Sequence, residues 1–441
     1  MKLWGKLSKA TLALMLTGAM VACSGNNGNA PASEGSGNKP AEKVELTMLT
    51  HYVGVNETQL KPLIEQWNSE NPDIQIKPIG VDFGELQKTI MTKQSAGQGA
   101  DIMHVYALWG GQLNKNNVLA EAPDHIAEDV KANYPEAAVK GASLDGKVFG
   151  YPTEVQAYGL FYNKRLLKEA GFDNPPATWD EMLSMAKAIE KKDSSGKVQV
   201  QGFGFQRGYA GLVDQPFMAM MAAAGSNLLS DDLTKSNLNT DAGKKTLELY
   251  SKVYGKDGMT DISFNATKGF GTGQVAMTIG AGWWAGSLKT VMKDSYTDVG
   301  VAPIPSLDGS SKGTIAYTWA WGVNSKSKNQ EAAWKFLQWM NSTVVKDDLT
   351  PEGSFLLEAF NTASSRKSDL ESPKLKEHLG SDPIIKNFSD ALTYASEEQS
   401  PATAAEVQDI LFKNIESMWT GQQSLDDTIN NAHTQIEEKL K

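Results

Sequence analysis

The chain has 441 residues, of which 40% are hydrophobic and 21% are charged, and its formal net charge is -10. This length exceeds what one small core needs, so we expect two domains. No run of basic residues occurs after the N-terminal segment, which argues against nucleic acid as a partner. The acidity itself mainly favours solubility.

Residues 1–23 predict export. A lysine-containing start precedes an apolar stretch that is shorter than the roughly 20 residues needed to span a membrane, which is typical of a signal peptide. The stretch ends in "MVAC", which resembles the lipobox of bacterial lipoproteins, although Met20 stands where Leu is usual. We therefore expect cleavage before Cys23, the only cysteine, and lipid on its thiol. The alternative is an ordinary signal peptide cleaved elsewhere, which would leave a free thiol.

Residues 24–43 predict a flexible tether. They are rich in Gly, Asn, Ser and Pro and have no apolar periodicity. A random coil of this length reaches about 25 Å, so a lipid on Cys23 would hold the globular part close to a membrane without burying it.

The globular part starts with a strand, a helix and a second strand. Apolar and polar residues alternate from Val44, the apolar residues between Leu60 and Trp67 recur at helical spacing, and "IQIKPIG" follows "NPD" as a strand. The pattern repeats with a helix from about Glu85 and a buried strand from about Asp101. This order predicts parallel βαβ units and an α/β fold.

The segment 151–172 is long, aromatic and extended until about Lys164, where it becomes helical. A strand of this length can belong to two sheets, so we expect it to cross between the two domains. The next helix is predicted to begin with a capping box, because Glu181 follows Thr178 by three residues.

The second half of the chain continues the alternation of strands and helices. "QVAMTIG" at 274–280 predicts a strand that leads into a tryptophan pair, and "DVGVAPIP" at 298–305 predicts a second crossing. Helical patterns occupy 329–340 and the stretch from about Pro401 onward.

Six segments, in this order, resemble those of the extracellular solute-binding proteins of ABC importers, in the carbohydrate-binding branch that includes maltose-binding protein. They are "NPDIQIKPI", "SAGQGADIMHVY", "LDGKVFGYPTEVQAYGLFYNKRLLKEAGFDNPPATWDEM", "FGTGQVAMTIGAGWW", "DVGVAPIP" and "KNQEAAWKFLQWM". The resemblance spans nearly all of residues 44–441, and the long third segment together with "GQVAMTIGAGWW" is the most specific part.

The resemblance implies an α/β fold of the periplasmic-binding-protein type, with two lobes that are each a sheet flanked by helices, and with a ligand cleft at the hinge. Lobe one would hold residues 44–154 and 306–360. Lobe two would hold residues 158–300 and 365–441.

Aromatic residues next to very small ones predict platforms for sugar rings. Trp283 follows a strand and "GAG", so its indole can cover the C–H face of a sugar while the small neighbours leave room. It also matches the stacking tryptophan of the family, whereas Trp284 would point the other way. The resemblance implies Tyr209 as a second stacking residue, and Trp109 at a strand end is a further candidate.

Further candidates lie on extended segments. Trp319 and Trp321 alternate along one strand, so one should face the cleft and the other a core, and we favour Trp319 for the cleft. Glu154 and Gln156 lie on the same side of the long crossing segment. Each offers two adjacent hydrogen-bonding sites for sugar hydroxyls.

Three polar candidates each have two interpretations. Asn56 and Glu57 follow the first strand and either cap the pocket from lobe one or begin a helix. Arg366 lies near a presumed third crossing and is either a ligand contact or a solvated charge. The five histidines are scattered without zinc-site spacing, so we expect no metal and no cofactor.

Together these features predict a monomeric substrate-binding lipoprotein at the extracellular face of a bacterial cell membrane. It would capture a sugar, and on account of its several aromatic residues an oligosaccharide, and deliver it to the permease subunits of an ABC importer. One alternative is a secreted glycoside hydrolase or lyase, which would need two carboxylates about 5 to 10 Å apart. Another is a binding protein for a different solute such as a polyamine, which would need more acids in the cleft.

Overall fold

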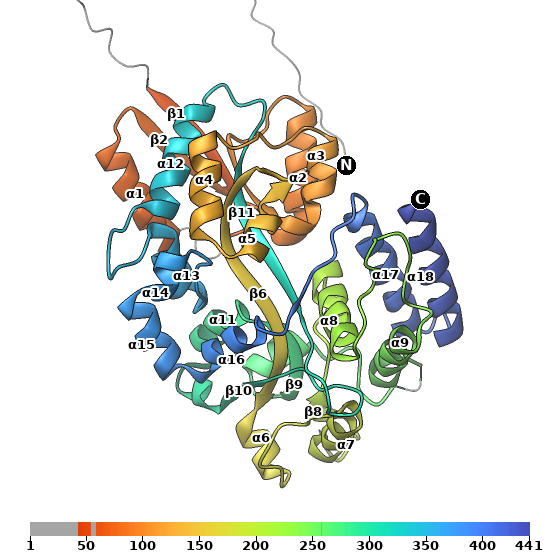
Figure 1. The fold of residues 1–441 in the computed structure, drawn as a ribbon. Coiled ribbons are helices and arrows are strands. Elements are labelled where there is room, and N and C mark those ends of the chain that lie inside the picture. Colours follow the sequence, from red (N-terminus) through yellow and green to blue (C-terminus); the bar gives the residue numbers. More distant parts are fainter. Residues whose placement is uncertain (1–42, 54–58, 257) are drawn as a thin grey trace, which may run out of the picture. The chain divides into compact units, whose positions relative to one another are not determined.

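The computed structural model describes residues 43–53, 59–256 and 258–441, and its ribbon is shown in Figure 1. The strands are β1 (Val44–Thr50), β2 (Ile74–Gly80), β3 (Ile102–Tyr106), β4 (Ser143–Leu144), β5 (Lys147–Val148), β6 (Gly150–Asn163), β7 (Lys191–Lys192), β8 (Val198–Phe203), β9 (Val275–Ala281), β10 (Val299–Ala302), β11 (Ile315–Val323) and β12 (Ser396–Glu397). In this part of the chain one mixed sheet runs in the order β2-β1-β3-β11-β6-β9-β8-β7. β10 pairs with β6, β12 pairs with β11, and β4 and β5 form a small sheet of their own.

The helices connect these strands. They are α1 (Lys61–Glu70), α2 (Phe83–Ser95), α3 (Gly110–Lys115), α4 (Asp124–Asn133), α5 (Glu136–Gly141), α6 (Lys164–Glu169), α7 (Trp179–Ile189), α8 (Ala210–Ala223), α9 (Asp241–Tyr254), α10 (Ala266–Gly271), α11 (Trp284–Met292), α12 (Gln330–Ser342), α13 (Pro351–Phe360), α14 (Lys367–Glu371), α15 (Pro373–Ser381), α16 (Pro383–Ala391), α17 (Ala404–Trp419) and α18 (Leu425–Leu440), with 3-10 turns η2 (Ala107–Trp109) and η3 (Lys293–Asp298). Among the described residues none of these helices has the length and apolar character needed to cross a bilayer.

The predicted βαβ unit at the start of the globular part is confirmed. β1 pairs in parallel with β2 along its whole length and also with β3, and α1 connects the first two strands. The side chain of Trp67, in α1, is buried, and its indole N–H donates to the carbonyl of Ile74 over 3.0 Å. This bond fixes the helix to the first residue of the second strand.

The long extended segment is one strand with two sets of partners. β6 pairs with β11 between Gly150 and Ala157, and with β9 between Tyr158 and Tyr162. Figure 1 shows β6 and β11 running side by side. The strand ends where it was expected to, because the side chain of Asn163 accepts a hydrogen bond from the backbone of Leu166 and so begins α6.

The segment 298–305 contains the predicted strand, β10, which pairs with β6 between Leu160 and Asn163. Beyond it, the carbonyl of Pro305 accepts a hydrogen bond from the indole of Trp179, the first residue of α7. β10 therefore pairs with β6 only beyond the point where β6 leaves β11, and a crossing within 298–305 stays a prediction. The capping box at the start of α7 is confirmed, with Thr178 and Glu181 in both of its hydrogen bonds.

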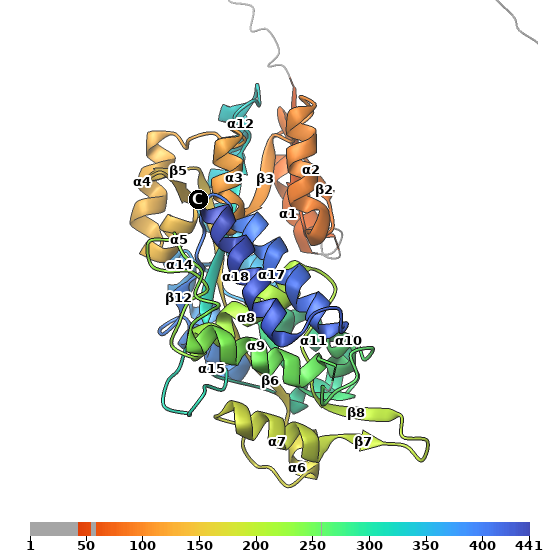
Figure 2. The ribbon, with the colours of Figure 1, turned by 90° about the vertical axis from the view of Figure 1, so that its right-hand side faces the viewer.

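The C-terminal helices are also as expected. α17 and α18 lie side by side in both views (Figures 1 and 2), and α17 packs against α8 and α9. The buried indole of Trp419 donates to the carbonyl of Tyr250 in α9, and the two rings stack with centroids 5.6 Å apart. Burial of each such aromatic side chain stabilises the fold by about 1.5 to 3 kcal/mol.

Candidate functional site

A cavity of about 300 Å³ lies at the carboxyl ends of β1, β3 and β9 and against the middle of β6 and β11. The carboxyl ends of strands are where open α/β sheets commonly hold ligands. Most of the lining side chains are aromatic, and we call this space the aromatic cavity. Its lining residues are His51, Tyr52, Val53, Phe83, Tyr106, Glu154, Tyr158, Tyr209, Leu212, Gln215, Trp283, Ser287, Tyr317, Trp319 and Phe360.

The tryptophan pair after β9 divides between the cavity and the core. Trp283 is half-buried and lines the aromatic cavity, whereas Trp284 is buried and packs edge-on against Phe161 with centroids 5.1 Å apart. Gly282, in front of the pair, has little space for a side chain. A Cβ atom there would lie 2.7 Å from the amide oxygen of Gln156 and 3.2 Å from the ring of Phe388, so a larger residue would have to shift these side chains.

Position along β11 separates the second pair of tryptophans, and the expectation that alternation would do so is wrong, because residues two apart in a strand share a face. Trp319 lines the aromatic cavity and stacks on His51, with ring centroids 4.1 Å apart. Trp321 is fully buried further along the same face, where its ring stacks on His104 at 4.1 Å and its indole N–H donates to Glu352 over 3.0 Å. Trp319 is therefore the member of the pair that faces the cavity.

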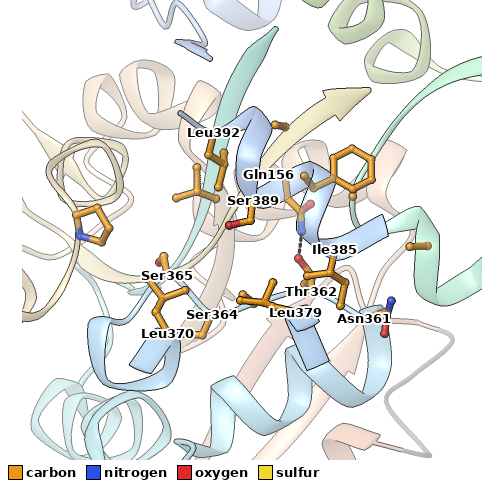
Figure 3. Close-up of a pocket in the computed structure, with 17 residues that line it drawn as sticks. Gln156, Asn361, Thr362, Ser364, Ser365, Leu370, Leu379, Ile385, Ser389 and Leu392 are labelled. Atoms are coloured by element: carbon orange, nitrogen blue, oxygen red, sulfur yellow. Dashed lines mark hydrogen bonds between the residues drawn. The ribbon is translucent and has the colours of Figure 1, made fainter. Parts of the chain in front are cut away.

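Glu154 and Gln156, expected on the same side of β6, reach different cavities. Glu154 lines the aromatic cavity, and its carboxylate accepts a hydrogen bond from the hydroxyl of Thr153. Burial raises the pKa of Glu154 to about 7, and the hydrogen bond from Thr153 opposes that shift. Gln156 lines a second cavity of about 110 Å³, where its amide nitrogen donates to the hydroxyl of Thr362 over 3.0 Å (Figure 3).

The two remaining aromatic candidates both contact Phe83. Tyr209 lines the aromatic cavity, and its ring lies 5.0 Å from that of Phe83. Trp109 is buried behind the cavity wall, stacked on Phe83 at 5.9 Å and edge-on to Trp319 at 5.5 Å. Trp109 thus supports two lining residues without lining the cavity itself.

Arg366 is buried and does not line the aromatic cavity. Its guanidinium donates two hydrogen bonds of 3.0 Å to the carboxylate of Asp129, and it lies over the ring of Tyr134 at 5.5 Å. In the structure it is therefore a paired charge, and the interpretation as a solvated charge is wrong. Asn56 and Glu57 lie outside the described residues.

Sequence reasoning missed a row of hydrogen bonds in the cavity wall. Tyr158 donates to the amide oxygen of Gln215, the amide nitrogen of Gln215 donates to Tyr106, and Tyr106 donates to Glu398. Burial raises the pKa of Glu398 to about 7. His51 and Phe360 were missed as well. No local pattern indicates these residues, because each comes from a different element.

The comparisons with known proteins identify the family. The model of the bacterial extracellular solute-binding protein family matches residues 54–347. The chain belongs to this family. The predicted resemblance is thereby confirmed, and the protein is a binding protein rather than an enzyme.

Individual relatives agree with this assignment. A maltodextrin-binding protein of Bacillus subtilis is 24% identical over 427 residues, which cover 92% of this chain and 94% of the relative. A putative binding protein of Brucella abortus is 28% identical over 296 residues, covering 66% of this chain and 70% of the relative. The fold matches that of maltose-bound MalE3 of T. maritima with a TM-score of 0.77 at 23% identity, over 89% of this chain and 99% of that one. The predicted periplasmic-binding-protein fold is confirmed.

Proposed function

We propose that the protein captures a sugar, in particular an oligosaccharide, in the aromatic cavity and delivers it to the permease of an ABC importer. The observation that carries this proposal is the set of flat side chains around one carboxyl group: Trp283, Trp319 and Tyr209 face the same space as Glu154. The names of the maltodextrin-binding relative and of the maltose-bound structure support the choice of sugar.

The chemistry of the cavity suits a neutral sugar. A sugar ring presents C–H groups on its faces and hydroxyls around its edge, so indole and phenol rings can cover the faces while polar groups bind the edge. The carboxyl group of Glu154 and the hydroxyl of Ser287 are available among the lining residues for that second task. A volume of about 300 Å³ is at the lower end of the range for small-molecule sites, so a long oligosaccharide would place one or two rings inside.

The same inventory disfavours the two alternatives. A polyamine carries several positive charges, and Glu154 is the only carboxylate among the described residues that line the cavity. A glycoside hydrolase would need a second carboxylate across the scissile bond, and the described lining supplies none.

The two-lobed arrangement is part of the proposal, with lobe one holding 44–154 and 306–360 and lobe two holding 158–300 and 365–441. It is supported by the change of partner along β6, which leaves β11 for β9 between Ala157 and Tyr158. Ligand would then close the lobes around the aromatic cavity. Small-angle X-ray scattering should show compaction when a sugar saturates the protein, and an unchanged profile would contradict closure.

The lipid anchor is also a proposal, because Cys23 and the tether lie outside the described residues. We propose that the mature chain begins at Cys23 and is held by lipid at the extracellular face of the membrane. The Cys23→Ala protein should then appear in the growth medium, whereas the wild type should stay with the membrane fraction. Equal partitioning of both proteins would contradict the anchor.

The experiment that tests the proposed function is a thermal-shift screen with glycans, amino acids and polyamines. A true ligand at 100 times its dissociation constant stabilises the folded protein by about 2.7 kcal/mol. We expect one or more neutral oligosaccharides to raise the melting temperature. Stabilisation by polyamines or amino acids alone would contradict the proposal.

A further inference from the structure

Two histidines next to the aromatic cavity form a hydrogen-bonded pair. His104 in β3 is fully buried, and His51, which follows β1, lines the cavity. Their Nδ1 atoms are 3.1 Å apart, and the rings are nearly parallel, with an interplanar angle of 7°. Because a hydrogen bond needs one donor and one acceptor, one Nδ1 carries a proton and the other does not.

The hydrogen-bond partner of Nε2 on His104 determines which Nδ1 carries the proton. Its Nε2 lies 3.3 Å from the hydroxyl of Thr153, and that hydroxyl donates to the carboxylate of Glu154. A hydroxyl has a single proton, so while Glu154 is ionised Thr153 can meet His104 only as an acceptor. The contact with Thr153 therefore assigns the proton of His104 to Nε2, because a bare Nε2 would face a lone pair of the Thr153 oxygen. The hydroxyl of Tyr52 also lies 3.4 Å from this nitrogen; it accepts in this arrangement and would donate in the opposite tautomer.

The tautomer of His104 in turn sets the tautomer of His51. Burial lowers the pKa of His51 to about 3 and holds the pKa of His104 well below its usual value, so both rings are neutral. A neutral imidazole with its proton on Nε2 has a bare Nδ1, and His104 therefore accepts from the Nδ1–H of His51. The Nε2 of His51, on the opposite side of its ring, is left without a proton.

The bare Nε2 of His51 is available to a ligand in the aromatic cavity. His51 lines the aromatic cavity, and its Nε2 has no hydrogen-bond partner among the described residues. The ring cannot easily turn away, because it is hydrogen-bonded to His104 at one edge and stacked on Trp319 with centroids 4.1 Å apart. The result is a fixed acceptor, in contrast to a hydroxyl side chain that can either donate or accept.

We infer that Nε2 of His51 accepts a hydrogen bond from one hydroxyl of the bound sugar, and that Glu154 fixes this polarity through Thr153 and His104. The inference rests on the proposed function for the identity of the ligand. A sugar that carries a hydroxyl at this position satisfies the nitrogen. A deoxy or O-alkylated sugar leaves it unpaired, so the pair of histidines selects for a free hydroxyl at one position of the ring.

The tautomers can be measured without any ligand. Nitrogen-15 NMR of the histidine-labelled protein at about pH 8.5, where Glu154 is ionised, should show the proton of His51 on Nδ1 and that of His104 on Nε2. Thr153→Val keeps the shape of the side chain but removes the hydroxyl, and it should release this fixed arrangement. A proton on Nε2 of His51 in the wild type would overturn the inference. Unchanged tautomers in Thr153→Val would show that Glu154 and Thr153 do not set the polarity of the histidine pair.

The role in binding is tested with maltose, maltotriose and arabinotriose as probes in calorimetric titrations. His51→Phe keeps a ring against Trp319 but lacks the nitrogen, and it should weaken binding by about tenfold. Single replacement of each hydroxyl by fluorine, which cannot donate, should weaken binding to the wild type at one position and have no such effect on His51→Phe.

The outcomes distinguish this inference from the proposed function. Equal losses in both proteins for every fluorinated sugar would overturn the assignment of His51 while leaving sugar binding intact. Binding of none of the three sugars would contradict the proposed function and, with it, the ligand half of the inference, whereas the tautomers would still be known from the NMR measurement.

Discussion

The phenol of Tyr106 donates a hydrogen bond to the buried carboxylate of Glu398, a residue 292 positions later in the chain. Tyr106 ends β3, and Glu398 directly follows β12. Gln215 of α8 joins the same group by donating to Tyr106. Three elements that are distant in sequence therefore meet at one wall of the aromatic cavity, and their polar groups form hydrogen bonds with one another.

This wall predicts a pH dependence of stability. Burial raises the pKa of Glu398 from 4.5 to about 7, so the folded state keeps a proton that the unfolded chain releases. The contribution is fully present below pH 4.5 and is lost as the pH rises to about 7, by roughly 3 kcal/mol. Glu398→Gln should not show this loss, so its melting temperature relative to wild type should rise between pH 4.5 and 7. Parallel melting profiles of the two proteins would contradict the prediction.

Trp283→Ala should weaken sugar binding by roughly tenfold to a hundredfold, because a stacked ring contributes about 1 to 3 kcal/mol. The melting temperature without ligand should change little, since Trp283 is only half-buried. Trp284→Ala is the matched control. Its side chain is in the core, so it should lose about 3 to 5 kcal/mol of stability. Calorimetric titration and melting of both variants check this, and a destabilised Trp283→Ala with intact affinity would place Trp283 in the core.

Arg366→Leu should destabilise the protein without changing its affinity for sugar. The substitution leaves Asp129 without the guanidinium that donates two bonds to it, and loss of one partner of a buried pair costs about 3 to 5 kcal/mol. Arg165→Leu breaks an exposed pair with Glu169 and should cost less than about 1 kcal/mol. Denaturant unfolding measures both. Weaker sugar binding by Arg366→Leu at full stability would instead make Arg366 a ligand residue.

Local patterns in the sequence were sufficient for most of the fold. The strand alternation from Val44, the capping box at Thr178 and the long strand that ends at Asn163 all depend on neighbours within a few positions. Alternation does not separate Trp319 from Trp321, because residues two apart in a strand share a face, and both rings pack against His104. Only Trp319 lines the aromatic cavity, because Trp321 lies further along β11 and is fully buried.

Long-range contacts explain what the sequence did not indicate. Arg366 is hydrogen-bonded to Asp129, 237 positions away, and His104 is hydrogen-bonded to His51, 53 positions away, so neither pairing leaves a periodic signal in the sequence. Alternation also failed to describe Glu154 and Gln156. Both lie on one side of β6 by their spacing, yet they reach different cavities near the point where the strand changes partners.

The most direct test of the central claim is a crystal structure of the protein with the oligosaccharide that gives the largest thermal shift. The account predicts one sugar ring lying face to face with the indole of Trp283 at about 4 Å, inside the aromatic cavity, with a hydroxyl within hydrogen-bonding distance of Nε2 of His51. A sugar bound elsewhere on the protein, with the aromatic cavity empty, would contradict it.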